Sequence, residues 1–368
     1  MTETPLYDII FYILVYFERG VTLIVLIAAL VIITLIGIRF SRFHEDYMGV
    51  PQTTAIKGFF AVVILFSHMA SYLNMTETFQ DRLFASVMWS IGQLMVTLFF
   101  FYSGFGIMES YRKKGTSYYR SFIRTRLLKV LLHFDLAVLL FAVVNLILKI
   151  DYPVSQYITC WFAWDSIGNS NWFIFDTLMF YLITFTAMMI SEETKIPPKL
   201  FCSVITVLCV LLWGVLEWTK GEPMAYWYNT ILCFPLGLWY SEFKKSIDSL
   251  ARKWPLWIAG LFLIGAVFAV LHAKKTTNAF CLCAPVFCLL ITWITMKIRF
   301  NNKVLLWLGK YSFSIYIIQR IPMIILKHFG LVSNNILFSA LSVITVFPLA
   351  FAFQKLLDVS DRLLFKKK

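Results

Sequence analysis

Long runs of apolar residues, separated by short polar segments, fill the sequence from residue 21 to residue 354. A helix that crosses the hydrocarbon core of a bilayer needs about 20 mostly apolar residues. By that measure the chain has eleven candidate membrane-spanning helices, at roughly 21–38, 55–73, 84–107, 130–150, 171–190, 199–218, 225–243, 254–272, 277–296, 304–326 and 334–354. The pattern predicts an all-α fold, a polytopic helical bundle that has the lipid bilayer as its solvent.

Composition supports this class. Hydrophobic residues make up 60% of the chain and charged residues only 14%, whereas soluble domains carry about 25% charged residues. A soluble core of this length could not bury so much apolar surface, so lipid must cover much of it.

The basic residues are unevenly distributed between alternate loops. The formal net charge of +13 could suggest a nucleic-acid partner. However, one set of alternate segments carries 24 of the 33 Lys and Arg residues and the other set carries 7. Because cytoplasmic loops of membrane proteins are the basic ones, this asymmetry places the C-terminus in the cytoplasm and the N-terminus outside. It indicates a multi-pass plasma-membrane protein and argues against nucleic-acid binding.

Cysteine usage gives no sign of a metal site. Six of the seven cysteines fall inside apolar runs, and only Cys160 lies in a predicted outer loop. The spacings include no paired C-x-x-C of the kind that binds zinc. We therefore interpret the cysteines as small apolar packing residues and predict no bound metal.

An ionisable side chain within a spanning helix is costly and is a functional candidate for that reason. Within the predicted helices these residues are His68, Asp135, Asp176, Lys310 and Arg320. Lys57 lies at the cytoplasmic mouth of the helix that carries His68. Eleven residues of helix place the imidazole roughly 16 Å deeper in the membrane. The cation could hold a phosphate and the imidazole could act as a general base on a hydroxyl; alternatively, His68 is a neutral residue hydrogen-bonded to a neighbouring helix.

Two further segments allow both a functional and a structural interpretation. Ser103 could donate a hydrogen bond to a substrate, but Gly104 and Gly106 beside it are also typical of close helix packing. The basic run Arg120, Arg124, Arg126 and Lys129 could bind phosphate, or could be ordinary positive charge of a cytoplasmic loop.

The last polar segment lies in the predicted span 304–326. Ser312, Tyr316 and Gln319 recur at helical spacing and share one face, which must look into protein or a water-filled cavity. Aromatic residues in the outer loop 151–170 fit either an interfacial belt or a platform for stacking sugars.

Taken in order, these features resemble the membrane acyltransferase 3 family, which acylates surface polysaccharides and related acceptors. Lys57 and His68 match the family's Arg-x10-His pattern with Lys in place of Arg. Ser103-Gly104-Phe105 and Arg126-Leu127-Leu128-Lys129 match its serine-glycine helix and basic segment. Trp172-Phe173 and the helix from Leu308 to Tyr316 match two later motifs. Gln319 stands where many members carry a histidine.

The resemblance implies an integral membrane O-acyltransferase that binds no permanent cofactor. Acyl-CoA, most simply acetyl-CoA, would be the donor, and a hydroxyl of a cell-surface glycan or its precursor would be the acceptor. The implied donor-binding residues are Lys57, Arg124, Arg126, Lys129 and Trp172. The implied catalytic residues are His68 as the base, with Ser103, Gln319 and Tyr316 steadying the developing oxyanion.

The resemblance also implies three parts: an N-terminal segment 1–51 with one extra spanning helix, a membrane acyltransferase core 52–354, and a basic cytoplasmic tail 355–368. Two other functions use the same polar interior. One is a transporter of a glycan or a lipid-linked precursor, with His68 or Asp176 as a proton relay. The other is a non-catalytic membrane partner on the same scaffold, which the departures at Lys57 and Gln319 leave open.

Overall fold

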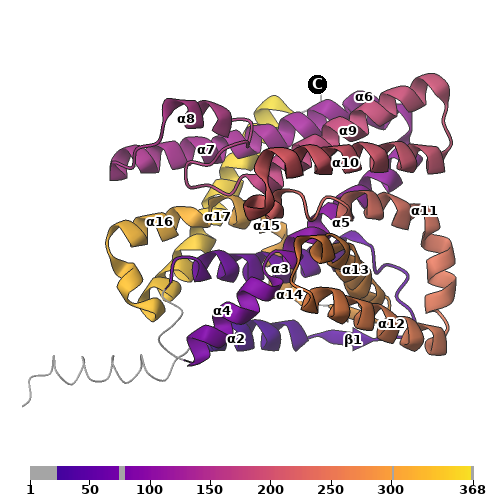
Figure 1. The fold of residues 1–368 in the computed structure, drawn as a ribbon, viewed down its shortest axis with the longest axis horizontal. Helices are drawn as coiled ribbons and strands as arrows, with labels where there is room; N and C mark the ends of the chain where they lie inside the picture. Colours follow the sequence, from indigo (N-terminus) through magenta and orange to yellow (C-terminus); the bar gives the residue numbers. More distant parts are fainter. Residues whose placement is uncertain (1–22, 74–78, 301, 366–368) are drawn as a thin grey trace, which may run out of the picture.

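The computed structural model describes residues 23–73, 79–300 and 302–365, and it is built almost entirely of helices (Figure 1). The first 22 residues, which include part of the predicted span 21–38, lie outside the described residues. Within the described part, eight helices or continuous helical runs are long and apolar enough to cross a membrane. The structure thus confirms the all-α, polytopic class.

These eight are α3 (Val50–Ala70), the run that contains α4 (Phe79–Ile91) and α5 (Leu94–Lys114), the run of α6 (Thr116–Phe122), η1 (Ile123–Leu127) and α7 (Leu128–Leu148), α9 (Trp172–Thr194), α10 (Pro198–Lys220), α12 (Trp254–Ala273), α13 (Thr277–Thr295) and α17 (Asn335–Leu364). The shorter elements are α2 (Ile24–Leu35), α8 (Val154–Cys160), η2 (Glu222–Trp227) and η3 (Leu331–Ser333).

Four of the eleven predicted spans differ from a single long helix. The segment 84–107 covers parts of two helices, α4 and α5, which a turn at Gly92 and Gln93 separates. In the segment 21–38 the described helix, α2, has only 12 residues. The segment 225–243 starts as the end of η2, and its helix, α11 (Cys233–Ala251), begins later than predicted. The segment 304–326 is broken into three short helices.

This broken segment consists of α14 (Lys303–Lys310), α15 (Ser312–Ile318) and α16 (Arg320–His328). The backbone leaves the helical region at Tyr311. Six of the seven residues of α15 are buried, and Phe313 is the exception. Interrupted helices at membrane depth are tolerated where protein surrounds them, and this one packs against α3, α7 and α17.

The only strands in the described residues form a short ribbon. β1 (Ile38–Phe40) pairs antiparallel with β2 (Ile298–Phe300), with Arg39 opposite Arg299. β1 and the last turn of α11 lie at the right of Figure 1, and we call this the basic end. The segment 149–171, which includes α8, and the last turn of α16 lie at the left, and we call this the loop end.

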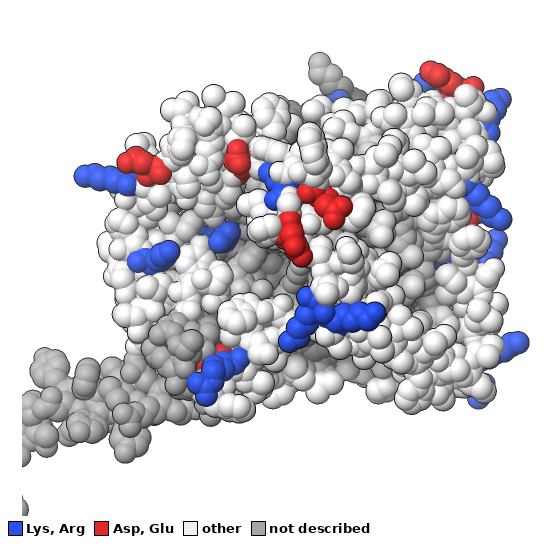
Figure 2. All heavy atoms as spheres, viewed as in Figure 1, with Lys and Arg blue, Asp and Glu red and all other residues white. Residues whose placement is uncertain are grey.

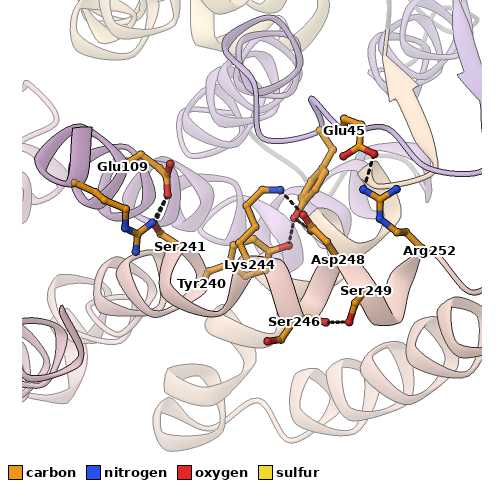
Figure 3. A network of polar contacts seen from close by, with 11 residues as sticks. Glu45, Glu109, Tyr240, Ser241, Lys244, Ser246, Asp248, Ser249 and Arg252 are labelled. Carbon is orange, nitrogen blue, oxygen red and sulfur yellow. Dashed lines mark hydrogen bonds and ion pairs between the residues drawn. The ribbon is translucent and has the colours of Figure 1, made fainter. Parts of the chain in front are cut away.

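Polar contacts fasten the basic end (Figure 3). Asp248 on α11 accepts hydrogen bonds from the Tyr47 hydroxyl at 2.6 Å and from Lys244 at 2.5 Å. Arg252 pairs with Glu45 at 2.5 Å. Burial raises the pKa of the Tyr47 hydroxyl, which therefore stays protonated as a donor. These contacts hold the segment before α3 against α11.

Two pairs of helices approach closely through glycines. A Cβ atom added at Gly309 on α14 would overlap the carbonyl oxygen of Thr54 on α3, and one added at Gly58 on α3 would overlap that of Leu305. Gly104 on α5 and Gly237 on α11 make the same reciprocal approach. Small residues let helix backbones touch in a membrane, where the hydrophobic effect does not drive helices together.

We expect Gly309→Val to destabilise the protein by about 1–3 kcal/mol, as overpacking of a tight contact does, because the new side chain must push α14 away from α3. The matched control is Gly106→Val on α5, where an added Cβ meets nothing within 4 Å. The measurement is the melting temperature and the monodisperse fraction of each purified variant in detergent. Equal stability of the two variants would contradict the packing role of Gly309.

Candidate functional site

A cavity of about 230 Å³ lies inside the bundle. Residues of α3, α5, α7, α9 and α15 line it, and most of them are apolar or aromatic. Its polar lining includes Lys57, Ser103, Tyr181 and Tyr316. Because these four come from four different helices, the cavity depends on the tertiary fold.

Lys57 is the cationic side chain of the cavity lining. It lies two turns into α3, a helix that begins at Val50 with a proline in its first turn. Within the described residues no carboxylate lies within 4.0 Å of its ammonium group. Arg126 of η1 is close enough to repel it and has no acidic partner in the same part of the chain. Two neighbouring cations without a counter-ion form a suitable site for an anion.

The other two cations expected to bind the donor have partners on α17. Lys129 pairs with Asp361 at 2.6 Å, and Arg124 donates to the Leu364 carbonyl oxygen at 2.9 Å. His133 also contacts Asp361, at 2.9 Å. Neither these three side chains nor Arg126 lines the cavity. The structure therefore brings Arg126 together with Lys57, whereas Arg124 and Lys129 fasten η1 and α7 to the C-terminal helix.

His68 and Gln319 touch. The amide nitrogen of Gln319 lies 2.8 Å from Nδ1 of His68 and 3.1 Å from the Tyr316 carbonyl oxygen. Gln319 is fully buried at the junction of α15 and α16, whereas His68 remains partly exposed. The contact joins residues 251 positions apart and connects the two polar segments that the sequence singled out.

The hydrogen bonds of Gln319 define the tautomer of His68. A carbonyl oxygen can only accept, so the Gln319 group that faces Tyr316 must be the NH₂. Its second hydrogen then points at Nδ1, which accepts, and the neutral ring carries its proton on Nε2. Oε1 of Gln319 is buried without a hydrogen-bond partner among the described residues, so an acceptor is free on the same side chain.

Tyr316 lies between His68 and the cavity. Its ring centroid is 6.3 Å from that of His68 and 5.2 Å from that of Phe173, which it meets edge-on. Ile64, one turn before His68 on α3, lines the cavity, but His68 itself does not. A donor that fills the cavity would therefore reach His68 past the Tyr316 ring.

Ser103 and Trp172 take different places. Ser103 lines the cavity, with its hydroxyl 3.5 Å from that of Tyr181, while Gly104 beside it packs on α11. Trp172 does not line the cavity; its ring meets Tyr226 edge-on at 6.0 Å. The next residue, Phe173, lines the cavity instead. Phe173 and Tyr181 carry no charge that would mark them in the sequence as site residues, although Phe173 belongs to the same Trp-Phe motif as Trp172.

The aromatic loop 151–170 contacts a lysine. The Lys220 ammonium lies 3.4 Å from the centroid of the Trp164 ring and 4.0 Å from that of Trp227. These cation–π contacts fix the loop to the end of α10. Trp164 thus has a structural partner on its ring face, which favours anchoring over sugar stacking for this residue.

No cluster of three or more potential metal ligands occurs within residues 23–73, 79–300 and 302–365. All seven cysteines are buried and free. Burial raises the pKa of the Cys160 thiol to about 11, so this thiol stays protonated near neutral pH and is a poor nucleophile.

Comparison with known protein families gives a match over most of the chain. A family model described as an acyltransferase domain matches residues 50–355. The matched region begins at the first residue of α3 and contains the cavity, the two cations and the His68–Gln319 pair. No curated protein and no solved structure matches the chain.

Proposed function

This chain belongs to the membrane acyltransferase 3 family, and we propose that it transfers an acetyl group from cytoplasmic acetyl-CoA to a hydroxyl of a cell-surface glycan or its precursor. The family makes the chain an acyltransferase, and its apolar helices make it a membrane protein. The donor, the acyl group, the acceptor and the plasma-membrane location are our proposal. The observation that carries it is a cavity lined by Lys57, which has no carboxylate partner among the described residues, and by Tyr316, which lies next to His68.

The cations support acyl-CoA as the donor. Coenzyme A carries phosphates, and cationic side chains bind phosphate through charge-assisted hydrogen bonds. Neither Lys57 nor Arg126 has a carboxylate partner in the described part of the chain, so both could make such bonds to a phosphate. We propose that the basic end faces the cytoplasm, in keeping with the distribution of Lys and Arg, so that cytoplasmic acyl-CoA reaches these two side chains first.

The chemistry would take place beside His68. The acceptor oxygen would attack the thioester carbon, forming a C–O bond, and its proton would pass to Nε2 of the imidazole, in the tautomer that carries its own proton on Nδ1. Collapse of the tetrahedral intermediate would break the C–S bond, and the imidazole would return the proton to the departing sulfur. The Tyr316 hydroxyl, which is buried without a partner in the described part of the chain, is our candidate donor to the oxyanion.

We expect Lys57→Met to raise the KM for acetyl-CoA by about tenfold, because a charge-assisted hydrogen bond of ordinary strength is lost, with a smaller effect on kcat. The measurement is initial rates of acetyl transfer by purified protein over a range of acetyl-CoA concentrations. Lys355→Met is the control, since Lys355 is exposed on α17 and lies over Phe351. A higher KM for Lys57→Met than for Lys355→Met would support the phosphate role of Lys57. Equal KM values for the two variants would contradict it.

The test of the function as a whole is the alkali-labile acyl content of cell-surface glycans, measured by mass spectrometry with and without the gene. Loss of an ester-linked group of acetyl mass in the deletion strain would support the proposal. Unchanged acylation at an unchanged amount of glycan would overturn the glycan acceptor.

A further inference from the structure

A second group of cations lies immediately beyond Gln319, towards the loop end. Arg320 begins α16, and its Nε donates to the Tyr72 hydroxyl at 3.3 Å. The guanidinium carbon is 5.7 Å from the centroid of the same ring. Arg320 is partly exposed, and within the described residues no carboxylate lies within 4.0 Å of it.

Lys327 adds a second charge to this group. Its ammonium lies 5.9 Å from the centroid of the Tyr72 ring, and it too has no acidic partner in the part of the chain that the structure describes. Tyr72 is held in turn by stacking on Phe338 at 5.9 Å. Figure 2 shows basic atoms and no acidic atoms over α16, at the left of the view. We refer to Arg320, Lys327 and Tyr72 as the Arg320 cluster.

The position of the cluster relates it to the reacting centre. Arg320 follows Gln319 directly, and Gln319 contacts His68. The segment that joins α7 to α9 packs against α16, the helix that Arg320 begins. In that segment, a Cβ atom added at Gly168 would lie only 2.8 Å from Cδ1 of Ile324 on α16. The cluster therefore lies between His68 and the loop end.

Unpaired charge next to the reacting centre requires an explanation. A guanidinium among spanning helices is costly unless it meets a counter-ion or water, and one hydrogen bond to a phenol leaves most of its donors unused. The planar fork of arginine suits carboxylate and phosphate groups, which it binds through two parallel hydrogen bonds. A transient anionic ligand at this site would supply the missing partner.

We propose that the acceptor is an anionic glycan whose carboxylate or phosphate binds the Arg320 cluster while its hydroxyl reaches His68. This inference rests on the proposed acyl transfer and adds the charge of the acceptor to it. The same cations could bind a lipid phosphate instead, and the experiment separates these two sources of the anion.

The test uses the full-length protein in nanodiscs of phosphatidylcholine, which has no net charge. Two acceptor probes differ only at one position: p-nitrophenyl β-glucuronide carries a carboxylate where p-nitrophenyl β-glucoside carries a hydroxymethyl group. Binding of each is measured by titration calorimetry, and transfer is measured with labelled acetyl-CoA. Using both readouts allows the anion site to be judged even where turnover is slow.

We expect the wild-type protein to favour the glucuronide by about tenfold or more, the value of a charge-assisted bond. Arg320→Gln should bring this ratio close to one, and Arg320→Lys should retain part of it. Lys275→Gln, which removes another loop-end cation outside the cluster, should leave the ratio at its wild-type value.

Three results would overturn the anion site: a wild-type ratio near one, an Arg320→Gln variant with the wild-type ratio, or binding of neither sugar. A lipid site would show as a wild-type ratio near one together with stabilisation by added phosphatidylglycerol that Arg320→Gln abolishes. Acetyl transfer to both sugars without a preference for the glucuronide would contradict the anion site but not the proposed acyl transfer. Preferential binding without transfer would contradict the proposed acyl transfer and support the anion site.

Discussion

Replacing His68 with alanine is expected to lower the rate of acetyl transfer by about 10²–10⁴-fold, the range that a positioned general base contributes. His68 is the only histidine in the described structure that contacts the buried polar group at the junction of α15 and α16. With the imidazole removed, the attacking hydroxyl has no group nearby to take its proton. The fold should survive, because His68 is partly exposed and its loss leaves the packing of Gly58 intact.

The measurement is kcat/KM for acetyl-CoA with purified protein at matched amounts. His44→Ala provides the control, since His44 is a partly exposed residue at the basic end whose side chain makes one hydrogen bond in the described structure, 3.4 Å long, with the Arg39 carbonyl oxygen. A His68→Ala rate within a few fold of wild type, at equal melting temperature, would contradict a catalytic role for this residue.

Helical geometry made part of the site predictable. Lys57 and His68 occur on one uninterrupted helix, α3, so the rise per residue predicts their separation from the sequence alone. Ser312, Tyr316 and Gln319 were predicted to face inward together, and all three are buried. That prediction held although the helix breaks at Tyr311, because Tyr316 and the residues around it still lie within one short helix.

The partner of each polar residue was not predictable in the same way. Arg124, Arg126 and Lys129 are alike in the sequence as basic residues of one segment. Only Asp361, more than 200 residues later, distinguishes Lys129 from the unpaired Arg126. Local patterns identify which segments are polar or basic, but the tertiary fold decides which charges are neutralised.

The contact between Gln319 and His68 is a second example, and its chemistry can be tested. We expect Gln319→Leu to lower kcat by about 10–100-fold, because leucine has no oxygen that could turn to accept a hydrogen bond from Nδ1–H of the ring that becomes charged during the reaction. The matched variant is Gln319→Glu, which keeps the length of the side chain and replaces the amide with two acceptor oxygens. Both are compared with wild type in the same acetyl-transfer assay.

The two variants separate two ways in which His68 could work. In the resting structure Gln319 donates to Nδ1, which leaves a hydrogen rather than a lone pair on Nε2. For Nε2 to act as the base, the proton must sit on Nδ1 and face an acceptor, which Gln319 can supply only by turning its unpartnered Oε1 towards the ring.

A glutamate supplies that acceptor directly, and it stabilises the imidazolium that forms as the hydroxyl is deprotonated. The Tyr316 carbonyl would repel a carboxylate, but the charge-assisted bond to the imidazolium is the stronger contact. We therefore expect Gln319→Glu to be more active than Gln319→Leu. If glutamate proves no better than leucine, His68 would have to act in the tautomer of the resting structure, with Nε2–H as a donor to the oxyanion.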